Sequence, residues 1–136
     1  MEPYRVKTPP LAGTRYADIT PPARRLLKNI QRRTKRRPYI RSAFFKKEKV
    51  FIVYFWDHLL QLPRYQRTRR LKYLPCAIEL IQKSRQAPKR YLKRDQPQEV
   101  FYRFSGRAPN GVAFAVQVKE RRKTGRKELM SVFPYI

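Results

Sequence analysis

The chain has 136 residues, which is enough for one small domain and leaves little room for a second hydrophobic core. Lys and Arg number 34 against 9 Asp and Glu, so the formal net charge is +25. Repulsion at this density disfavours a compact free state unless an anion neutralises it, so the composition predicts a polyanionic partner. No apolar run reaches about 18 residues and no signal-peptide pattern opens the chain, so we expect a soluble cytoplasmic protein without a membrane partner.

Two residues limit metal and disulfide chemistry. Cys76 is the only cysteine and His58 the only histidine in the sequence. One cysteine cannot form an internal disulfide, and one cysteine with one histidine cannot build a zinc site. Cys76 falls in an apolar periodic stretch, where a buried structural thiol is the expected role. The sequence therefore predicts no metal and no cofactor.

Residues 1–49 are rich in proline and in basic residues, and we expect them to form a basic extension that is partly extended. The proline pairs at 9–10 and 21–22 are each predicted to interrupt regular structure. A short helix is predicted over residues 22–30. Its apolar side is formed by Leu26, Leu27 and Ile30.

A run of basic residues follows this short helix and ends at Pro38. In most proteins such a run is a solvated tail. In a chain this basic, we favour contact with phosphate groups. The residues predicted to bind phosphates are Arg32, Arg33, Lys35, Arg36 and Arg37.

Two amphipathic helices are predicted next, over residues 49–62 and 69–86. A polar link, residues 64–68, separates them, and the second helix is expected to kink or begin afresh at Pro75. The apolar stripe of the first helix consists of Phe51, Phe55, Leu59 and Leu62, and that of the second consists of Leu71, Leu74, Ile78 and Ile81. The second helix also carries basic residues, of which Arg69, Arg70 and Lys72 are predicted to bind the same phosphates.

Three strands are predicted in quick succession after a polar link over residues 89–97. Alternating patterns indicate strands at 100–105 and 112–119, and a third is expected at 129–133. The Asn110-Gly111 pair suits a tight turn, and residues 123–126 supply a looser one. Consecutive strands should therefore pair as antiparallel hairpins.

These elements predict an α+β fold, in which two helices pack on a small antiparallel meander of three to four strands. The basic extension, residues 1–49, would precede this compact domain, residues 50–136. No internal repeat suggests a larger assembly.

His58 and Arg103 are the first two candidates for catalysis. A lone histidine beside an apolar helix stripe is more often a packing residue than a catalytic one. RNA cleavage by the 2′-hydroxyl, however, needs a proton carrier, and histidine suits that role. Arg103 lies in mid-strand, opposite Val100, Tyr102 and Phe104; it is either a surface cation or a guanidinium that grips a phosphate.

Lys119 and Ser131 complete the candidate set. Lys119 and Glu120 end the second strand, where they form either a surface ion pair or a cation with a general base. Ser131 lies in the middle of the third strand, where a hydroxyl is usually only tolerated but can bond a phosphate oxygen.

Aromatic residues make RNA a better expectation than DNA. Aromatic residues make up 13% of the chain, and most of them fall on periodic core faces. An exposed one, such as Tyr91 or Tyr135, can stack on an unpaired base. No zinc finger, basic heptad region or clear helix-turn-helix pattern offers a means of reading the DNA major groove. The phosphates expected to meet the basic residues are therefore those of RNA.

The order of two helices followed by a short meander resembles the small metal-independent endoribonuclease toxins grouped as barnase, EndoU, colicin and RelE-like. The resemblance covers residues 50–134 and is greatest to the phage-associated members of that group. The motifs that carry it are Trp56-Asp57-His58-Leu59, the helix end at Ala87-Pro88, the strand Phe101-Tyr102-Arg103-Phe104, and the final Ser131-Val132-Phe133-Pro134.

The resemblance implies RNA cleavage without a metal. In that reading His58 transfers protons, Arg103 and Lys119 hold and neutralise the phosphate, and Ser131 orients it. The basic extension, residues 1–49, has no counterpart in the family pattern.

Two functions therefore stay open on the sequence alone. The first is an endoribonuclease of toxin type, with an acidic antitoxin or immunity protein as a possible partner. The second is a non-catalytic RNA-binding component of a ribonucleoprotein or of the ribosome. Charge does not separate the two, because both predict binding that weakens with salt.

Overall fold

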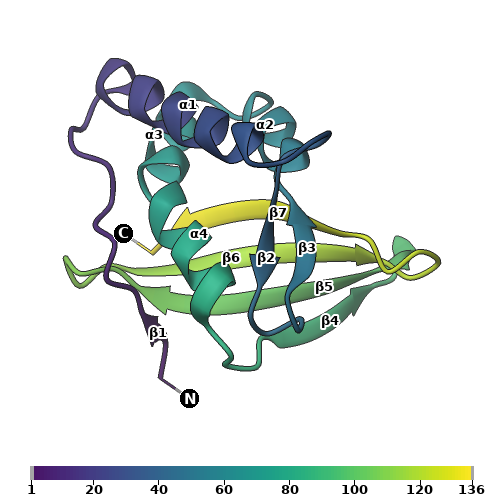
Figure 1. The fold of residues 1–136 in the computed structure, drawn as a ribbon. Helices are drawn as coiled ribbons and strands as arrows, with labels where there is room; N and C mark the ends of the chain where they lie inside the picture. Colours follow the sequence, from purple (N-terminus) through teal and green to yellow (C-terminus); the bar gives the residue numbers. More distant parts are fainter. Residues whose placement is uncertain (1, 136) are drawn as a thin grey trace.

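The structure is a computed structural model that describes residues 2–135, and it contains four helices and one seven-stranded mixed sheet within that range (Figure 1). The helices are α1 (Tyr16–Arg32), α2 (Val53–Leu59), α3 (Arg64–Lys72) and α4 (Leu74–Lys83). The strands are β1 (Tyr4–Arg5), β2 (Tyr39–Ser42), β3 (Glu48–Phe51), β4 (Lys89–Lys93), β5 (Gln96–Arg107), β6 (Ala113–Arg121) and β7 (Lys127–Pro134).

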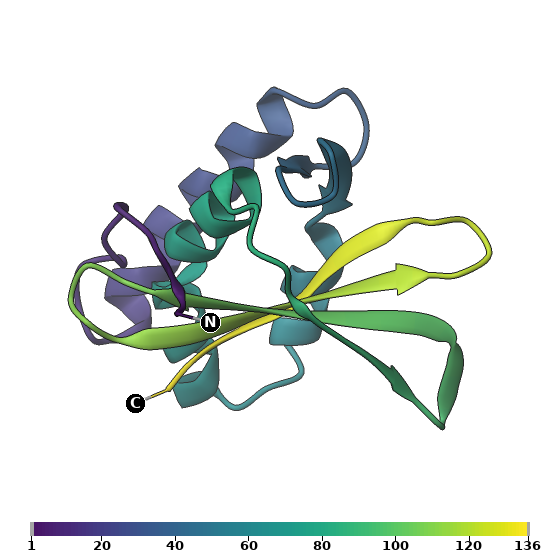
Figure 2. The same ribbon diagram turned by 90° about the horizontal axis from the view of Figure 1, so that it is seen from below.

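The strand order across the sheet is β1-β5-β6-β7-β3-β2, and β4 also pairs with β5. The β1–β5 and β3–β7 pairs are parallel, whereas the other pairs are antiparallel. Seen from below, the long strands β5, β6 and β7 twist strongly along their length (Figure 2).

The fold class predicted from the sequence is wrong. The structure has four helices, where two in the domain and one short helix in the extension were predicted, and it has a seven-stranded mixed sheet in place of a three- to four-stranded antiparallel meander. The difference arises mainly in residues 1–49, which were expected to precede the domain as an extension. They contribute β1, α1, β2 and the start of β3, and Ile19, Ala23 and Ile40 are buried in the core.

The three predicted strands and both of their hairpins are confirmed as β5, β6 and β7. The β5–β6 turn contains Gly111 at φ +89°, and the β6–β7 turn contains Gly125 at φ +75°, conformations that glycine adopts without steric cost. The segment 89–97, predicted as a polar link, instead contains β4, which pairs with β5 along one edge.

The helix predicted over residues 49–62 is a strand followed by a shorter helix. Its first residues form β3, which runs parallel to β7 through the pairs Val50 with Lys127 and Phe51 with Glu128. The stripe of Phe51, Phe55 and Leu59 fits a helix, but a β-branched and aromatic run fits a strand equally well. The partner strand lies far along the chain, so local periodicity could not decide between them.

Two helices replace the one predicted over residues 69–86. The expected polar link 64–68 is the beginning of α3, and α4 begins anew at Leu74 with Pro75 in its first turn. The break predicted at Pro75 is therefore confirmed. Proline is tolerated there because the first amide groups of a helix have no partner within the helix.

Helix α1 is longer than the predicted helix and passes through Pro21 and Pro22. Each proline removes one backbone hydrogen bond from the helix interior. Ile19 and Ala23 lie on either side of the pair and are fully buried, so packing of this side of α1 outweighs the unfavourable effect of proline in a helix interior.

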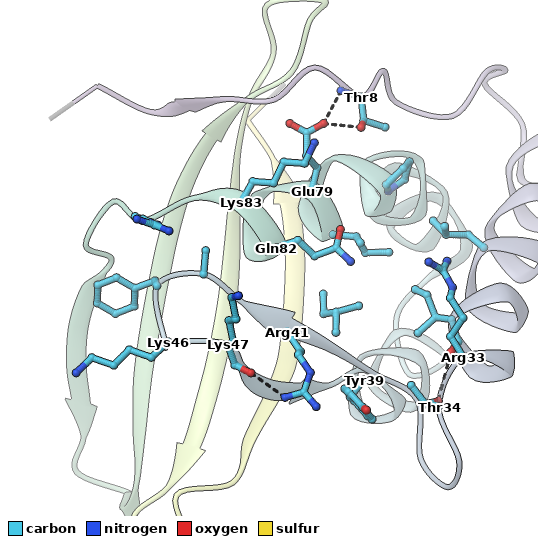
Figure 3. A pocket seen from close by; sticks show the side chains of 18 residues that line it. Thr8, Arg33, Thr34, Tyr39, Arg41, Lys46, Lys47, Glu79, Gln82 and Lys83 are labelled. Carbon is cyan, nitrogen blue, oxygen red and sulfur yellow. Dashed lines mark hydrogen bonds between the residues drawn. The ribbon is translucent and has the colours of Figure 1, made fainter.

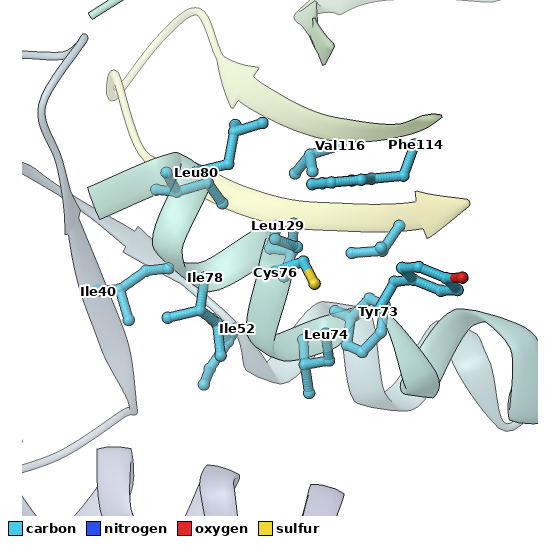
Figure 4. Close-up of a cluster of buried hydrophobic side chains, with 14 of the residues drawn as sticks. Ile40, Ile52, Tyr73, Leu74, Cys76, Ile78, Leu80, Phe114, Val116 and Leu129 are labelled. Atoms are coloured by element: carbon cyan, nitrogen blue, oxygen red, sulfur yellow. The ribbon is translucent and has the colours of Figure 1, made fainter. Parts of the chain in front are cut away.

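Helix α4 covers one face of the sheet and forms the centre of the core (Figure 4). Its side chains Cys76 and Leu80 lie against Phe114 and Val116 of β6 and Leu129 of β7, all of them buried. Burial raises the pKa of the Cys76 thiol to about 12, and its Sγ lies 3.2 Å from the carbonyl oxygen of Thr8. The expected structural role of this cysteine agrees with its position.

Gly106 allows α4 to approach the sheet this closely. A Cβ atom at this position would lie 2.5 Å from the Phe114 ring and 2.6 Å from Leu80. We expect Gly106→Ala to lower the free energy of unfolding by about 1–3 kcal/mol, because it overpacks the core. Chemical denaturation measures this, with Ser105→Ala on the exposed neighbour as the control. A loss below about 0.5 kcal/mol for Gly106→Ala would contradict the packing described.

Glu79 fastens the N-terminal segment to α4. Its carboxylate accepts hydrogen bonds from the backbone amide of Lys7 (2.9 Å) and from the amide (2.8 Å) and hydroxyl (2.5 Å) of Thr8. Burial acts to raise the pKa of Glu79, but these hydrogen bonds outweigh it and the pKa lies below its ordinary value. Residues 6–8 are thereby held beside β1 and along α4.

We expect Glu79→Gln to lower the free energy of unfolding by about 1–3 kcal/mol at neutral pH, because charge-assisted hydrogen bonds are lost. Trypsin should then cleave at Arg5 and Lys7 faster in the folded protein. For a carboxyl with a depressed pKa, the stabilisation is present above the ordinary pKa and is lost as pH falls through the folded-state pKa. The difference between the two proteins should therefore shrink in acid, and unchanged trypsin cleavage would contradict this role.

Candidate functional site on the open face of the sheet

Strand alternation gives the sheet two different faces. Val116 and Val118 of β6 point to the side covered by α4, the core face. Gln117 and Lys119 point to the other side, which we call the open face. Its further members on β4, β5 and β7 are Tyr91, Glu99, Phe101, Arg103, Glu128, Ser131 and Phe133.

The centre of the open face is a row across β5, β6 and β7. The register places Arg103 opposite Gln117, and Gln117 opposite Ser131. The Ser131 hydroxyl donates a hydrogen bond to Gln117 Oε1 at 3.0 Å, and Gln117 Nε2 donates to the Tyr91 hydroxyl. Tyr91 also stacks on Phe101, with ring centroids 5.4 Å apart. The side chains around Arg103 are thus fixed by one another.

Arg103 lies between two aromatic rings. Its Cζ is 5.7 Å from the Tyr91 centroid and 5.5 Å from the Phe133 centroid. Its Nε is buried and has no hydrogen-bond partner among the residues described. A buried donor without a partner costs free energy, so the two rings, and not a hydrogen bond at Nε, hold the Arg103 guanidinium in place. Arg70 of α3 shares the Phe133 ring, with its Cζ 5.8 Å from the centroid.

Lys119 lies further along the open face, over the ring of Tyr54 from α2. Its Nζ is 3.6 Å from that centroid, 3.9 Å from Glu99 and 4.0 Å from Glu128. A hollow of about 220 Å³ opens beside it. The lining side chains are Arg37, Glu99, Lys119, Arg121, Arg126 and Glu128.

His58 lies on the same Tyr54 ring as Lys119. The imidazole stacks on it with centroids 5.8 Å apart and an interplanar angle of 11°. Partial burial, together with the positive charges of Arg70 and Lys119, holds the pKa of His58 below its ordinary value. His58 is half-buried, whereas its neighbours Phe55 and Leu59 are in the core. The imidazole is therefore mainly neutral at pH 7, the state in which it accepts a proton.

Three of the four predicted catalytic residues, Arg103, Lys119 and Ser131, lie on the open face, and the fourth, His58, contacts it from α2. Tyr54 joins His58 to Lys119, and Phe133 joins Arg70 to Arg103. Ser131 is too buried to contact a ligand directly, because it is 5% exposed and its hydroxyl donates a hydrogen bond to Gln117. It can act on a ligand through Gln117 and Tyr91, but not by direct contact from an exposed position.

Glu120 does not share this face with Lys119. It lies on the core side, where its carboxylate is 3.0 Å from the Lys127 ammonium and 3.5 Å from the Tyr102 hydroxyl. Neighbouring residues of a strand point to opposite faces, so the adjacent pair expected to act as cation and general base is divided.

The eight predicted phosphate-binding residues lie in different places. Arg37 and Arg70 are beside the candidate site. Arg33 lines a groove elsewhere, and the Lys72 ammonium donates to the Gly13 carbonyl, which gives it a structural role. Arg69 is half-buried next to Arg70, whereas the remaining three are exposed at or after the end of α1: Arg32, Lys35 and Arg36.

Tyr54 and Gln117 are members of the site that sequence reasoning missed. The alternation of β6 places Gln117 on the same face as Lys119, two residues away, so that signal was present in the sequence. Tyr54 is one helical turn before His58 on α2, but the predicted helix over residues 49–62 gave no indication of which strand it faces.

Residues 2–135 contain neither a candidate metal-binding cluster nor a candidate membrane-spanning helix. No group of three or more His, Cys, Asp or Glu side chains is placed to hold a metal ion there. None of the described helices is long and apolar enough to cross a bilayer. No protein-family model, curated protein or solved structure matches the chain. Function has to be inferred from the open face itself.

The titration of His58 tests the geometry of this site directly. We expect its pKa to lie below the ordinary value of about 6.5 and to rise when Arg70→Met removes a neighbouring positive charge. Because His58 is the only histidine, NMR of its ring protons follows it without ambiguity. Arg122→Met, in the β6–β7 turn, is the control and should leave the pKa unchanged. An Arg70→Met protein with the wild-type pKa would contradict the placement of Arg70.

Proposed function

We propose that the protein is an RNA-binding, metal-independent endoribonuclease of toxin type, which cleaves by attack of the 2′-hydroxyl on the adjacent phosphate. The observation that carries this proposal is a pair of contacts at the open face, in which the Tyr54 ring joins His58 to Lys119 and the Phe133 ring joins Arg70 to Arg103. The short sequence motifs that resemble those of the endoribonuclease toxins, such as Trp56-Asp57-His58-Leu59, favour the same function.

Each group has a role that its surroundings support. Neutral His58 accepts the proton of the 2′-hydroxyl as its oxygen bonds to phosphorus, and its lowered pKa favours the neutral form. The P–O5′ bond breaks, which leaves a 2′,3′-cyclic phosphate, and the departing 5′-oxygen takes a proton from water. Arg103 holds the phosphate through the charge of its guanidinium, and the positive charges of Arg70 and Lys119 stabilise the charge that develops on it. Ser131 is a positioning residue, since it fixes Gln117 and thereby Tyr91 beside Arg103.

Exposed aromatic surface next to this row suits single-stranded RNA. Tyr135 is 57% exposed and contacts Phe133 edge to face at 5.7 Å. An unpaired base can stack there while its phosphate meets Arg103, because stacking on aromatic side chains is tolerant of base identity. We propose that the RNA strand crosses β7 in this way.

The second candidate function is RNA binding without cleavage, in a ribonucleoprotein or the ribosome. The observation in its favour is that Lys119 already lies near two carboxylates, Glu99 and Glu128. A lysine held in this way is less available to a phosphate, and His58 would then only pack on Tyr54. For either function we propose a cytoplasmic location, and for the ribonuclease an acidic antitoxin or immunity protein as partner.

Cleavage of labelled RNA in the presence of EDTA separates the two functions. We expect wild-type protein to give discrete products, and His58→Ala to be slower by about 10²–10⁴-fold, the usual contribution of a general acid–base group. Arg103→Gln should also lose activity, because it loses the charge that holds the phosphate. The matched control is Gln61→Ala, an exposed residue just after α2.

A native gel run on the same samples completes the test. Intact RNA that is shifted equally by the wild type and His58→Ala would establish the binding function and end the catalytic one. Cleavage by His58→Ala at the wild-type rate would remove His58 from the mechanism.

A further inference from the structure

A large groove lies on the far side of α4 from strands β5, β6 and β7 (Figure 3). Its walls are α4, the end of α1 and the β2–β3 hairpin, and its volume is about 1370 Å³. Thr8 of the N-terminal segment closes one end, where it is hydrogen-bonded to Glu79. None of the open-face residues lines it, so the groove is separate from the candidate ribonuclease site.

The groove combines an apolar floor with a basic rim. The floor is aliphatic apart from one ring: Leu26, Ile30, Ile40, Phe44, Pro75 and Ile78. The rim carries Arg33, Arg41, Lys46, Lys47, Lys83 and Arg85. Glu79 is the one acidic side chain in the lining, and its two oxygens already accept hydrogen bonds from residues 7 and 8. The six basic residues of the rim therefore outnumber the single carboxylate of the groove, Glu79, which also interacts with Lys83.

The hairpin holds two of the rim lysines in an unusual backbone conformation. Lys46 and Lys47 have φ values of 54° and 66°, in the left-handed region that favours glycine. Arg41 lies beside them, because its guanidinium donates to the Lys47 carbonyl at 3.0 Å. Left-handed backbone at residues with long side chains is uncommon and often marks a functional position.

We propose that this groove binds an acidic, amphipathic segment of a partner protein. Apolar side chains on one side of the segment would cover the floor, and carboxylates on its other side would pair with the rim. This inference does not depend on ribonuclease activity.

Nucleic acid fits the groove less well than such a segment. Base stacking needs exposed rings, and the floor is mainly aliphatic. The Tyr39 ring already meets the Arg41 guanidinium at 5.4 Å and the Lys49 ammonium at 4.7 Å. Phe44 packs edge to face on Phe45 at 5.1 Å. The phosphates of RNA could bind the basic rim, but its bases would have few aromatic side chains to stack on at the floor.

Fluorescence anisotropy with the full-length protein tests this proposal with three defined probes. The first is a labelled peptide of about 14 residues made of Leu, Glu and Ala, with leucines on one helical face. The second has the same composition in a shuffled order, and the third is a single-stranded oligonucleotide of equal charge. We expect the amphipathic peptide to bind at least about tenfold more tightly than the shuffled peptide, because only it covers the floor.

Two pairs of variants localise the binding. Leu26→Gln, on the floor, should weaken the amphipathic peptide about tenfold, whereas Leu27→Gln, which lines a different hollow on α1, should not. Lys83→Gln with Arg85→Gln should weaken it about fivefold, and the control pair Arg122→Gln with Lys123→Gln less than about twofold. Circular dichroism checks that each variant is folded.

Equal affinity for the two peptides, or equal effects of Leu26→Gln and Leu27→Gln, would overturn the proposal. Two results together would instead assign the groove to nucleic acid. The oligonucleotide would displace the peptide, and the Lys83 and Arg85 variant would lose more affinity for the oligonucleotide than for the peptide. Arg103→Gln should leave peptide binding unchanged. Absence of RNA cleavage would therefore not affect the conclusion on peptide binding, and absence of peptide binding would not affect the conclusion on cleavage.

Discussion

The alternation of side chains along β6 governs both the stability and the chemistry of this protein. Val116 and Val118 join the core under α4, while Gln117 and Lys119 face the open side. Because β6 is paired on both sides, the same register that buries the valines sets Arg103, Gln117 and Ser131 in one row. A shift of one residue would exchange the two faces and place charges in the core. The position of the candidate site is therefore a consequence of burying the opposite face.

Most of the few acidic residues stabilise the fold through hydrogen bonds and ion pairs within the protein. Glu79 holds the N-terminal segment, Glu48 and Glu120 pair with Lys127 at 2.8 and 3.0 Å, and Glu99 and Glu128 lie near Lys119. Burial would lower the pKa of Lys127, but its two carboxylate partners outweigh this and raise it. With carboxylates used at these internal contacts, much of the basic surface has no acidic partner. That excess favours anionic ligands on more than one face of the molecule.

Local pattern was sufficient for the C-terminal half of the sheet and insufficient for the rest. The hairpins of β5, β6 and β7 join neighbouring segments, so alternation and turn residues indicated them, together with the face of Arg103. The strands β1 and β3 pair in parallel with distant partners, and no local pattern specifies such a partner. The candidate site was predicted only in part for the same reason, the dependence on distant partners. His58, Lys119 and Arg103 were predicted from their residue types. The contacts of Tyr54 and Phe133, which join these residues to their neighbours, depend on how α2 and α3 pack against β7.

The β2–β3 hairpin physically connects the groove to the open face. Arg41 and Lys47 of this hairpin belong to the groove, while its second strand, β3, pairs with β7 at Lys127 and Glu128. The pairing is short, and the ion pair between Glu48 and Lys127 reinforces it. Glu128 in turn lies near Lys119 on the open face. The hairpin therefore contacts both sites: its Arg41 and Lys47 line the groove, and β3 lies beside the β7 residue whose carboxylate is near Lys119.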